Sequence, residues 1–150
     1  MKVVIAGAGE VGTHLAKMLS KENHEIVLLD EDNEKLERLA IQVDLLTVGG
    51  AANSIMDLKE SGISKADLFI AVAHTEELNI ISAILSKKIG AKKTIARIDN
   101  LEYLYPSNQK YFNQLGIDSL IYPEMIAARE IVGLLHQTGT TDIVNFSGGK

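Results

Sequence analysis

Three glycines near the amino terminus, Gly7, Gly9 and Gly12, have the spacing G-x-G-x-x-G. Glycines in such a loop permit a tight turn, let a phosphate group approach the backbone, and allow a helix to pack closely on a strand. The loop follows an apolar run, residues 2–6, and helical periodicity begins at Glu10, where free backbone amides would favour an anion. The residues predicted to hold the diphosphate of a nucleotide are Gly7, Ala8, Gly9, Glu10, Val11 and Gly12.

A carboxylate lies where a nucleotide ribose would need one. Asp30 ends a second apolar run, residues 26–29, and follows Gly12 by 18 residues. There it would accept hydrogen bonds from the ribose hydroxyls and repel a 2′-phosphate, which favours NAD over NADP. Glu31, the next residue, belongs to the same predicted site. The alternative is a glycine turn that only packs, with Asp30 as the neighbour of a helix cap.

Further site residues are expected after other strands, because ligands of parallel sheets bind beyond the carboxyl ends of the strands. Gly50 and Ala51 follow the third apolar run. Small residues there would let an adenine or ribose lie flat, although simple turn chemistry explains them equally well. Ala73, His74 and Thr75 follow the fourth run, and His74 is expected to contact ligand rather than to catalyse.

Arg97 is a single arginine within an otherwise apolar fifth strand. Burying a guanidinium group without a partner is costly, so Arg97 needs an anion nearby. That anion is either a nucleotide phosphate, which is the interpretation we favour, or a local acid such as Asp99 or Glu76.

Short apolar runs alternate with helical patterns along the chain and would position these residues. The expected strands are residues 2–6, 24–30, 45–48, 66–73, 94–98 and 118–122. The expected helices start at Glu10, after a cap at Asp32, after a cap at Asn53 and at Glu76, and two more cover residues 101–115 and 124–136. Nearly all the strands are continuously apolar, as in a sheet that is buried on both faces. The predicted fold class is therefore α/β: a Rossmann-type, doubly wound, parallel six-stranded sheet with helices on both faces.

Composition argues against several other classes of protein. The 150 residues contain no cysteine, so neither disulfides nor thiolate metal sites contribute. A net charge of −5 argues against a nucleic-acid-binding surface. No apolar run reaches the roughly 18 residues that a membrane span requires, and the first run resembles a secretory signal only superficially. The four histidines show no metal-ligand spacing, so no metal site is predicted.

With these residues placed, the chain resembles the N-terminal nucleotide-binding domain of the potassium-uptake regulators, the TrkA N-terminal (RCK/KTN) family. The resemblance covers nearly all 150 residues. It includes MKVVIAGAGEVG, IVLLDED around Asp30, and ADLFIAVAHTEELNIISAILSKKIGA, in which Asn79 stands at the family's polar position. It continues through TIARIDNLEY around Arg97, GIDSLIYPEMIAAREI and the closing DIVNFSGGK. The resemblance adds Asn79 to the expected nucleotide-binding residues.

The resemblance implies a cytoplasmic regulatory subunit, peripheral to the inner face of the cell membrane and not inserted in it. Its partner would be a membrane-embedded potassium channel or transporter. Family members bind NAD(H) or ATP/ADP, with AMP a further possible ligand, and transmit the bound state as a conformational change. The helix after Pro123 would join a dimer interface, and dimers would build a ring. Residues 1–136 would form the nucleotide-binding domain, and residues 137–150 a connector to a following domain.

Two departures from the family pattern bear on the choice of ligand. Members that favour ATP tend to carry an arginine in the glycine loop, whereas this chain has Glu10, whose negative charge would oppose a terminal phosphate. NAD(H) is therefore the expected ligand. The family's frequent acid after the third strand's glycine is replaced by Ala51, so a contact through the backbone is expected there.

Two other classes of function are compatible with a glycine loop. The chain would be the cofactor-binding half of an NAD-dependent dehydrogenase if a catalytic domain followed it, or a methyltransferase if it bound S-adenosylmethionine. It contains no Tyr-x-x-x-Lys, cysteine nucleophile or Gly-x-Ser-x-Gly, so no catalytic residue is predicted. The dinucleotide-type glycine spacing and Arg97 disfavour the methyltransferase, and the regulatory function is preferred.

Overall fold

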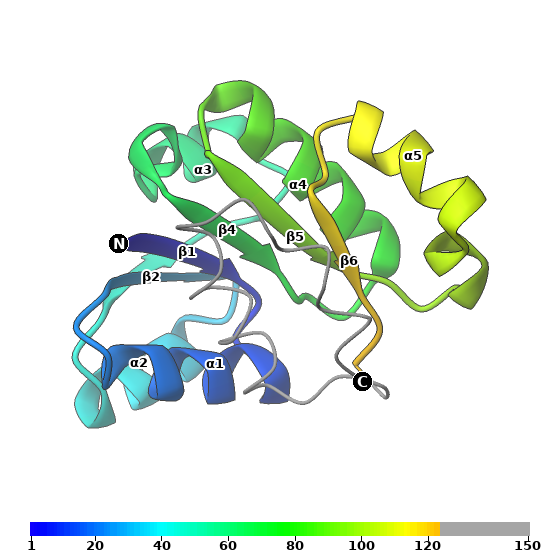
Figure 1. Cartoon of the computed structure of the whole chain (residues 1–150). Coiled ribbons are helices and arrows are strands. Elements are labelled where there is room, and N and C mark those ends of the chain that lie inside the picture. Colours follow the sequence, from blue (N-terminus) through cyan, green and yellow to red (C-terminus); the bar gives the residue numbers. More distant parts are fainter. Residues whose placement is uncertain (124–150) are drawn as a thin grey trace.

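A single six-stranded sheet organises residues 1–123, which are the residues that the computed structural model describes (Figure 1). Its strands are β1 (Lys2–Ala6), β2 (Glu25–Asp30), β3 (Leu46–Gly49), β4 (Leu68–Ala71), β5 (Lys93–Arg97) and β6 (Ser119–Ile121). All pairings are parallel and the strand order is β3-β2-β1-β4-β5-β6. The order reverses between β1 and β4, which is where ligands of such sheets bind.

Helices cover both faces of the sheet (Figure 1). α1 (Glu10–Ser20) and α2 (Asn33–Gln42) lie on one face, and α3 (Ile55–Glu60), α4 (Glu76–Ile89) and α5 (Pro106–Gln114) lie on the other. Two short 3-10 turns, η1 (Ile63–Lys65) and η2 (Leu101–Leu104), complete the described elements. The predicted fold class is confirmed.

The central strand β1, which precedes the glycine loop, is buried on both faces of the sheet. Side chains of a strand alternate between its two faces. Val3 and Ile5 pack with Leu15 of α1 in one core cluster, whereas Val4 and Ala6 pack with residues of α3 and α4 in the other. Because the side chains of residues 3–6 are fully buried, β1 is fixed on both faces and holds the loop that follows it in a defined position.

The third strand departs from the expectation of a buried strand. β3 lies at the edge of the sheet, and β2 is its single partner among the described strands. The side chain of Leu46 is 58% exposed. An apolar run does not show whether a strand has one neighbour or two, so the sequence pattern did not distinguish this edge strand from the buried ones.

The helix expected over residues 101–115 is divided into η2 and α5. The break falls at Tyr105, which has an extended conformation (φ −60°, ψ 133°). Tyr105 precedes Pro106, and the residue before a proline is disfavoured in the helical conformation because the proline ring clashes with it. Pro106 then begins α5, a position that proline tolerates.

Other boundaries also differ from the sequence-based ones. The helix cap predicted at Asn53 is wrong: Ser54 caps α3, and its hydroxyl accepts the Asp57 amide at 3.2 Å. The cap predicted at Asp32 is confirmed, since its carboxylate accepts the amides of Glu34 and Lys35. The strand expected over residues 66–73 is shorter than predicted, since β4 covers only Leu68–Ala71. The predicted helix 124–136 and connector 137–150 lie outside the described residues.

Candidate nucleotide-binding site

The glycine loop between β1 and α1 is shaped by contacts that leave no room for side chains at two of its three glycines. Gly7 has φ +117°, and a Cβ there would lie 2.8 Å from the backbone of Val72 and Ala73. A Cβ on Gly12 would overlap the Gly7 carbonyl oxygen. At Gly9, by contrast, no atom lies within 4 Å of the Cβ position. The expected tight turn and close helix–strand packing are both present, and the open side of the loop is at Gly9.

The amino terminus of α1 lies directly beside this open side. Gly9 is the N-cap residue, and no side chain caps the helix. The first turn of a helix has amides without intrahelical partners, and these carry the positive end of the helix dipole. α2 and α3, in contrast, are capped by Asp32 and Ser54. The start of α1 is therefore suited to receive an anion from outside the helix.

Asp30 faces the loop from the end of β2. One carboxylate oxygen accepts the Ala8 amide at 2.6 Å, and the other accepts the Asp32 amide at 2.7 Å. The two hydrogen bonds fix the orientation of the carboxylate and join the glycine loop to the turn that begins α2. Each carboxylate oxygen has a second lone pair, so both retain capacity to accept a hydrogen bond from a ribose hydroxyl.

A cavity of about 490 Å³ lies at this end of the sheet. It brings together most of the residues that the sequence predicted: Gly7, Gly9, Glu10, Val11, Asp30, Ala73, His74 and Arg97. Sequence reasoning missed Lys35, Val72 and Pro123, which also line it. Lys35 belongs to α2 and reaches the cavity because that helix approaches the glycine loop. The predicted residues that do not line this cavity are Ala8, Gly12, Glu31, Gly50, Ala51, Thr75 and Asn79.

Asn79 acts on the site through the backbone. The residue is 1% exposed, and its amide oxygen accepts the Ala73 amide at 2.7 Å. Its amide nitrogen donates to the carbonyls of Ala73 at 3.0 Å and Arg97 at 3.2 Å. The first two bonds reach the segment that follows β4, and the third reaches the end of β5. Asn79 therefore holds two strand ends at a fixed separation, and its side-chain donors are already used.

Arg97 reaches the cavity from the end of β5 with a side chain that is 30% exposed. Of the two acids considered for it, Asp99 is the closer partner, with 3.9 Å between Nε and the carboxylate. Glu76 instead accepts the backbone amides of Asp99 and Asn100 at 2.7 and 2.8 Å. The long contact to Asp99 leaves most of the hydrogen-bonding capacity of the guanidinium available to the cavity.

The loop after β3 is occupied by an acid that the sequence pattern did not identify. The Ala51 amide donates to the Asp57 carboxylate at 2.9 Å, and a Cβ on Gly50 would lie 2.5 Å from the same group. The Ala51 amide, through which a ligand contact was predicted, is therefore hydrogen-bonded to a side chain of α3. Glu31 is exposed beside Asp30.

Two kinds of feature are absent from residues 1–123. No helix in that range is both long and apolar enough to cross a membrane. No group of three or more His, Cys, Asp or Glu side chains there is arranged to hold a metal ion.

A doubly wound parallel sheet, with a glycine loop and an uncapped helix terminus where the strand order reverses, defines the class of Rossmann-type nucleotide-binding domains. The model of the TrkA-N domain family matches residues 3–123. The chain therefore belongs to the TrkA-N domain family.

Curated relatives match over the whole chain. The chain is 39% identical over 150 residues to a Trk system potassium uptake protein TrkA homolog of Archaeoglobus fulgidus, covering 100% of this chain and 34% of the relative. It is 35% identical to the Trk system potassium uptake protein TrkA of Halomonas elongata, covering 99% of this chain and 33% of the relative. The chain thus spans about a third of the length of these relatives.

Solved structures share the fold at lower sequence identity. The TrkA-N domain of the inner membrane protein ybaL from Escherichia coli superposes with a TM-score of 0.70 at 18% identity, covering 89% of this chain and 96% of that one. The GsuK channel bound to NAD gives a TM-score of 0.67 at 17% identity, covering 89% and 22%. The Shewanella denitrificans Kef CTD in its AMP-bound form gives 0.64 at 18% identity, covering 99% and 88%.

Proposed function

We propose that this domain binds NAD(H) in the cavity between β1 and β4 and, through that binding, regulates a potassium transporter or channel in the membrane. The observation that carries the proposal is the open Gly9 beside the uncapped start of α1, with the Asp30 carboxylate held opposite. NAD-bound GsuK and AMP-bound Kef CTD share this fold, which supports an adenine nucleotide as the ligand.

Two parts of a dinucleotide, the diphosphate and the adenosine ribose, have matching groups in the cavity. The backbone amides at the start of α1 would receive the diphosphate, and Asp30 would accept hydrogen bonds from the adenosine ribose. Arg97 contributes positive charge on the β5 side of the cavity. Glu10 contributes negative charge at the loop, which disfavours the additional phosphate of ATP. ADP and AMP would use the same amides and carboxylate with fewer contacts.

Regulation requires only that the ligand bind two arrangements of the assembly unequally. A several-fold ratio of affinities corresponds to about 1 kcal/mol, so a small change in contacts at the cavity is sufficient. The relatives named as potassium uptake proteins support a membrane-embedded potassium transporter as the partner. We infer a cytoplasmic domain, acting as a homo-oligomer at the inner face of the membrane, with a regulatory rather than a catalytic role.

Calorimetric titration with NAD, NADH, ATP, ADP and AMP tests the proposal. We expect NAD or NADH to bind more tightly than ATP, and Asp30→Ala to weaken every ligand that contains an adenosine ribose by roughly tenfold or more. Asp67→Ala is the matched control, because Asp67 also accepts a backbone amide, that of Lys2 at 2.8 Å, but does so at the amino-terminal ends of β1 and β4, away from the cavity. ATP binding more tightly than NAD(H) would refute the inference from Glu10. An equal loss in both variants, or no binding by any nucleotide, would overturn the proposed site.

A further inference from the structure

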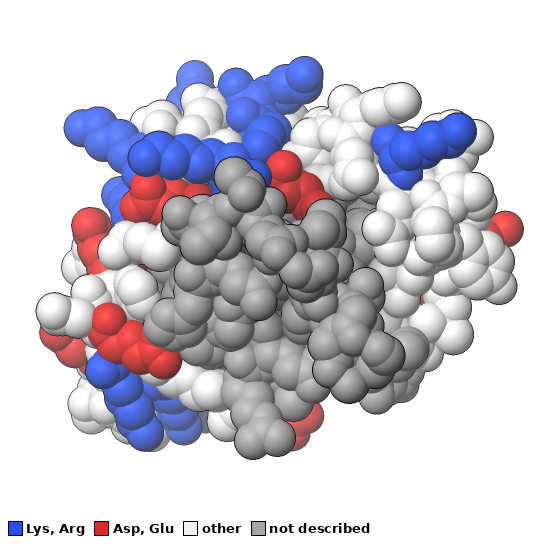
Figure 2. Space-filling view, viewed as in Figure 1, with Lys and Arg blue, Asp and Glu red and all other residues white. Residues whose placement is uncertain are grey.

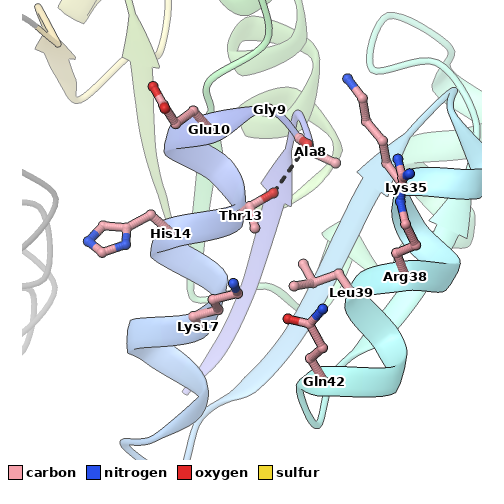
Figure 3. A pocket seen from close by; sticks show the side chains of 10 residues that line it. All are labelled: Ala8, Gly9, Glu10, Thr13, His14, Lys17, Lys35, Arg38, Leu39 and Gln42. Atoms are coloured by element: carbon pink, nitrogen blue, oxygen red, sulfur yellow. Dashed lines mark hydrogen bonds between the residues drawn. The ribbon is translucent and has the colours of Figure 1, made fainter.

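A second cavity, of about 600 Å³, lies between α1 and α2 on the other side of the glycine loop (Figure 3). It shares Gly9, Glu10 and Lys35 with the nucleotide cavity and extends from there along the two helices. None of the residues that the sequence predicted for nucleotide binding lines it beyond the glycine loop. The α1–α2 groove is therefore adjacent to the proposed nucleotide site but occupies separate space.

Three basic side chains line the α1–α2 groove. Lys17 lies on the α1 side, and Lys35 and Arg38 lie on the α2 side. Lys35 and Arg38 are three residues apart, which places them on one face of the helix. Figure 3 shows the one acidic lining residue, Glu10, pointing away from α2. The groove therefore concentrates positive charge in a protein whose net charge is −5.

Within residues 1–123, some basic residues form ion pairs with acids, whereas the three in the groove are among those that form none. Figure 2 shows lysine and arginine side chains gathered along the upper edge with acids close beside them. The ion pairs of the domain include Lys92 with Asp67 at 3.0 Å and Lys2 with Glu25 at 3.9 Å. Within residues 1–123, no salt bridge to an acid forms at Lys17, Lys35 or Arg38. Like charges that line one cavity without ion pairs repel one another, and an anion bound among them would reduce that repulsion.

Neutral groups complete the lining. Thr13 donates its hydroxyl to the Ala8 carbonyl at 3.2 Å, so the hydroxyl is held at the upper end of the groove. The Gln42 amide lines the lower end, and Leu39 provides an apolar wall between them. A guanidinium, two ammonium groups and an amide together offer many donors, which is the chemistry that recognises a phosphate group.

We propose that the α1–α2 groove is a second anion site that binds a phosphate group and is distinct from the diphosphate position at the start of α1. The phosphate belongs either to a soluble phosphate compound or to the headgroup of an anionic lipid. Lys35 lines both the groove and the nucleotide cavity. A phosphate in the groove and a nucleotide in its cavity would therefore interact with the same ammonium group, and each would change the affinity of the other.

Inorganic pyrophosphate is the probe for the soluble form of the ligand. It is titrated into the 150-residue chain saturated with NADH, and backbone amide chemical shifts are followed by NMR. We expect shifts centred on Thr13, Lys17 and Gln42, and roughly tenfold weaker binding in the double variant Lys17→Ala/Arg38→Ala. The matched control is Lys59→Ala/Lys65→Ala, which removes the same charge from exposed residues of α3 and η1.

Vesicles distinguish the two sources of the phosphate. Co-sedimentation with phosphatidylglycerol vesicles, compared with phosphatidylcholine vesicles, would identify a lipid headgroup if it is lost in the groove variant and kept in the control variant. Pyrophosphate binding that is weakened in the groove variant and kept in the control variant, without co-sedimentation with either kind of vesicle, would identify a soluble ligand. Equal behaviour of the two double variants towards both probes would overturn the proposal. If NADH does not bind but the groove variant still loses pyrophosphate, the proposed nucleotide site fails and this second site stands.

Discussion

Substituting the glycines of the loop one at a time separates its packing from its binding surface. In Gly12→Ala the new methyl group would overlap the Gly7 carbonyl oxygen, and it would lie 2.9 Å from the Gly7 carbonyl carbon and 3.3 Å from Val72 Cγ2. Backbone atoms cannot move aside by changing a rotamer, so the cost lies near the upper end for overpacking, about 3 kcal/mol. Alanine gains about 1 kcal/mol over glycine within a helix. The net loss of unfolding free energy is therefore about 2 kcal/mol.

Gly9→Ala is the matched substitution on the open side of the loop. Its Cβ meets no atom within 4 Å, and its φ of −80° suits any residue. Replacing a glycine N-cap by alanine costs under about 1 kcal/mol. The same methyl group, however, would stand where the diphosphate must approach, and we expect NADH affinity to fall roughly tenfold.

Urea unfolding followed by circular dichroism measures the loss of unfolding free energy. Calorimetric titration with NADH, under conditions where both variants are folded, measures the loss of affinity. Gly12→Ala should be the less stable of the two variants, and Gly9→Ala should bind NADH the more weakly. A Gly12→Ala protein as stable as the unsubstituted chain would refute the packing argument. A Gly9→Ala protein that binds NADH normally would refute the assignment of the open side to the diphosphate.

Other substitutions test contacts at the site and elsewhere in the domain. Asn79→Ala should lower the unfolding free energy by about 3 kcal/mol, because it removes the side-chain partner of three part-buried backbone groups. Ser86→Ala is its control on the same helix: the buried Ser86 hydroxyl has no hydrogen-bond partner among the described residues, so its removal should change stability by less than about 0.5 kcal/mol, and a large loss would contradict this account. The hydrogen bond from the Lys2 amide, with Lys92 beside it, lowers the pKa of the Asp67 carboxyl below 3.8. The stability that Asp67 adds is therefore present above pH 3.8 and lost as pH falls through its folded-state pKa. Asp67→Asn should cost about 1 kcal/mol at pH 7 and less at pH 3 in urea titrations, whereas a loss independent of pH would exclude this cause.

The elements and the glycine loop were predictable from the sequence because their signals are local. Gly7, Gly9 and Gly12 fall between a β-type run and a helical pattern, and each has the predicted backbone surroundings. The end of β2 at Asp30 follows from the same alternation. The family resemblance is confirmed by the match of the TrkA-N domain model.

Other features depend on residues that are distant in the sequence, and no local pattern could identify them. The exposure of β3 follows from its having one neighbour in the sheet. Lys35 reaches the nucleotide cavity because α2 packs beside the glycine loop. Asn79, which the resemblance predicts as a ligand contact, also donates to the backbone carbonyl of Arg97, 18 residues away, and so holds two strand ends. Asp57 fills the loop after β3 in place of the acid that the family frequently carries there.

The double hydrogen bond of Asp30 has a consequence for the thermodynamics of recognition. The carboxylate joins the glycine loop to the β2–α2 turn through two hydrogen bonds within the protein, so the chain's own contacts hold this half of the site together. Binding there need not order a loop, and we expect a small entropic penalty and rapid association. We expect a conformational signal to originate on the opposite side of the cavity. There the guanidinium of Arg97 has only a long contact to Asp99, 3.9 Å, and could pair with a bound anion instead.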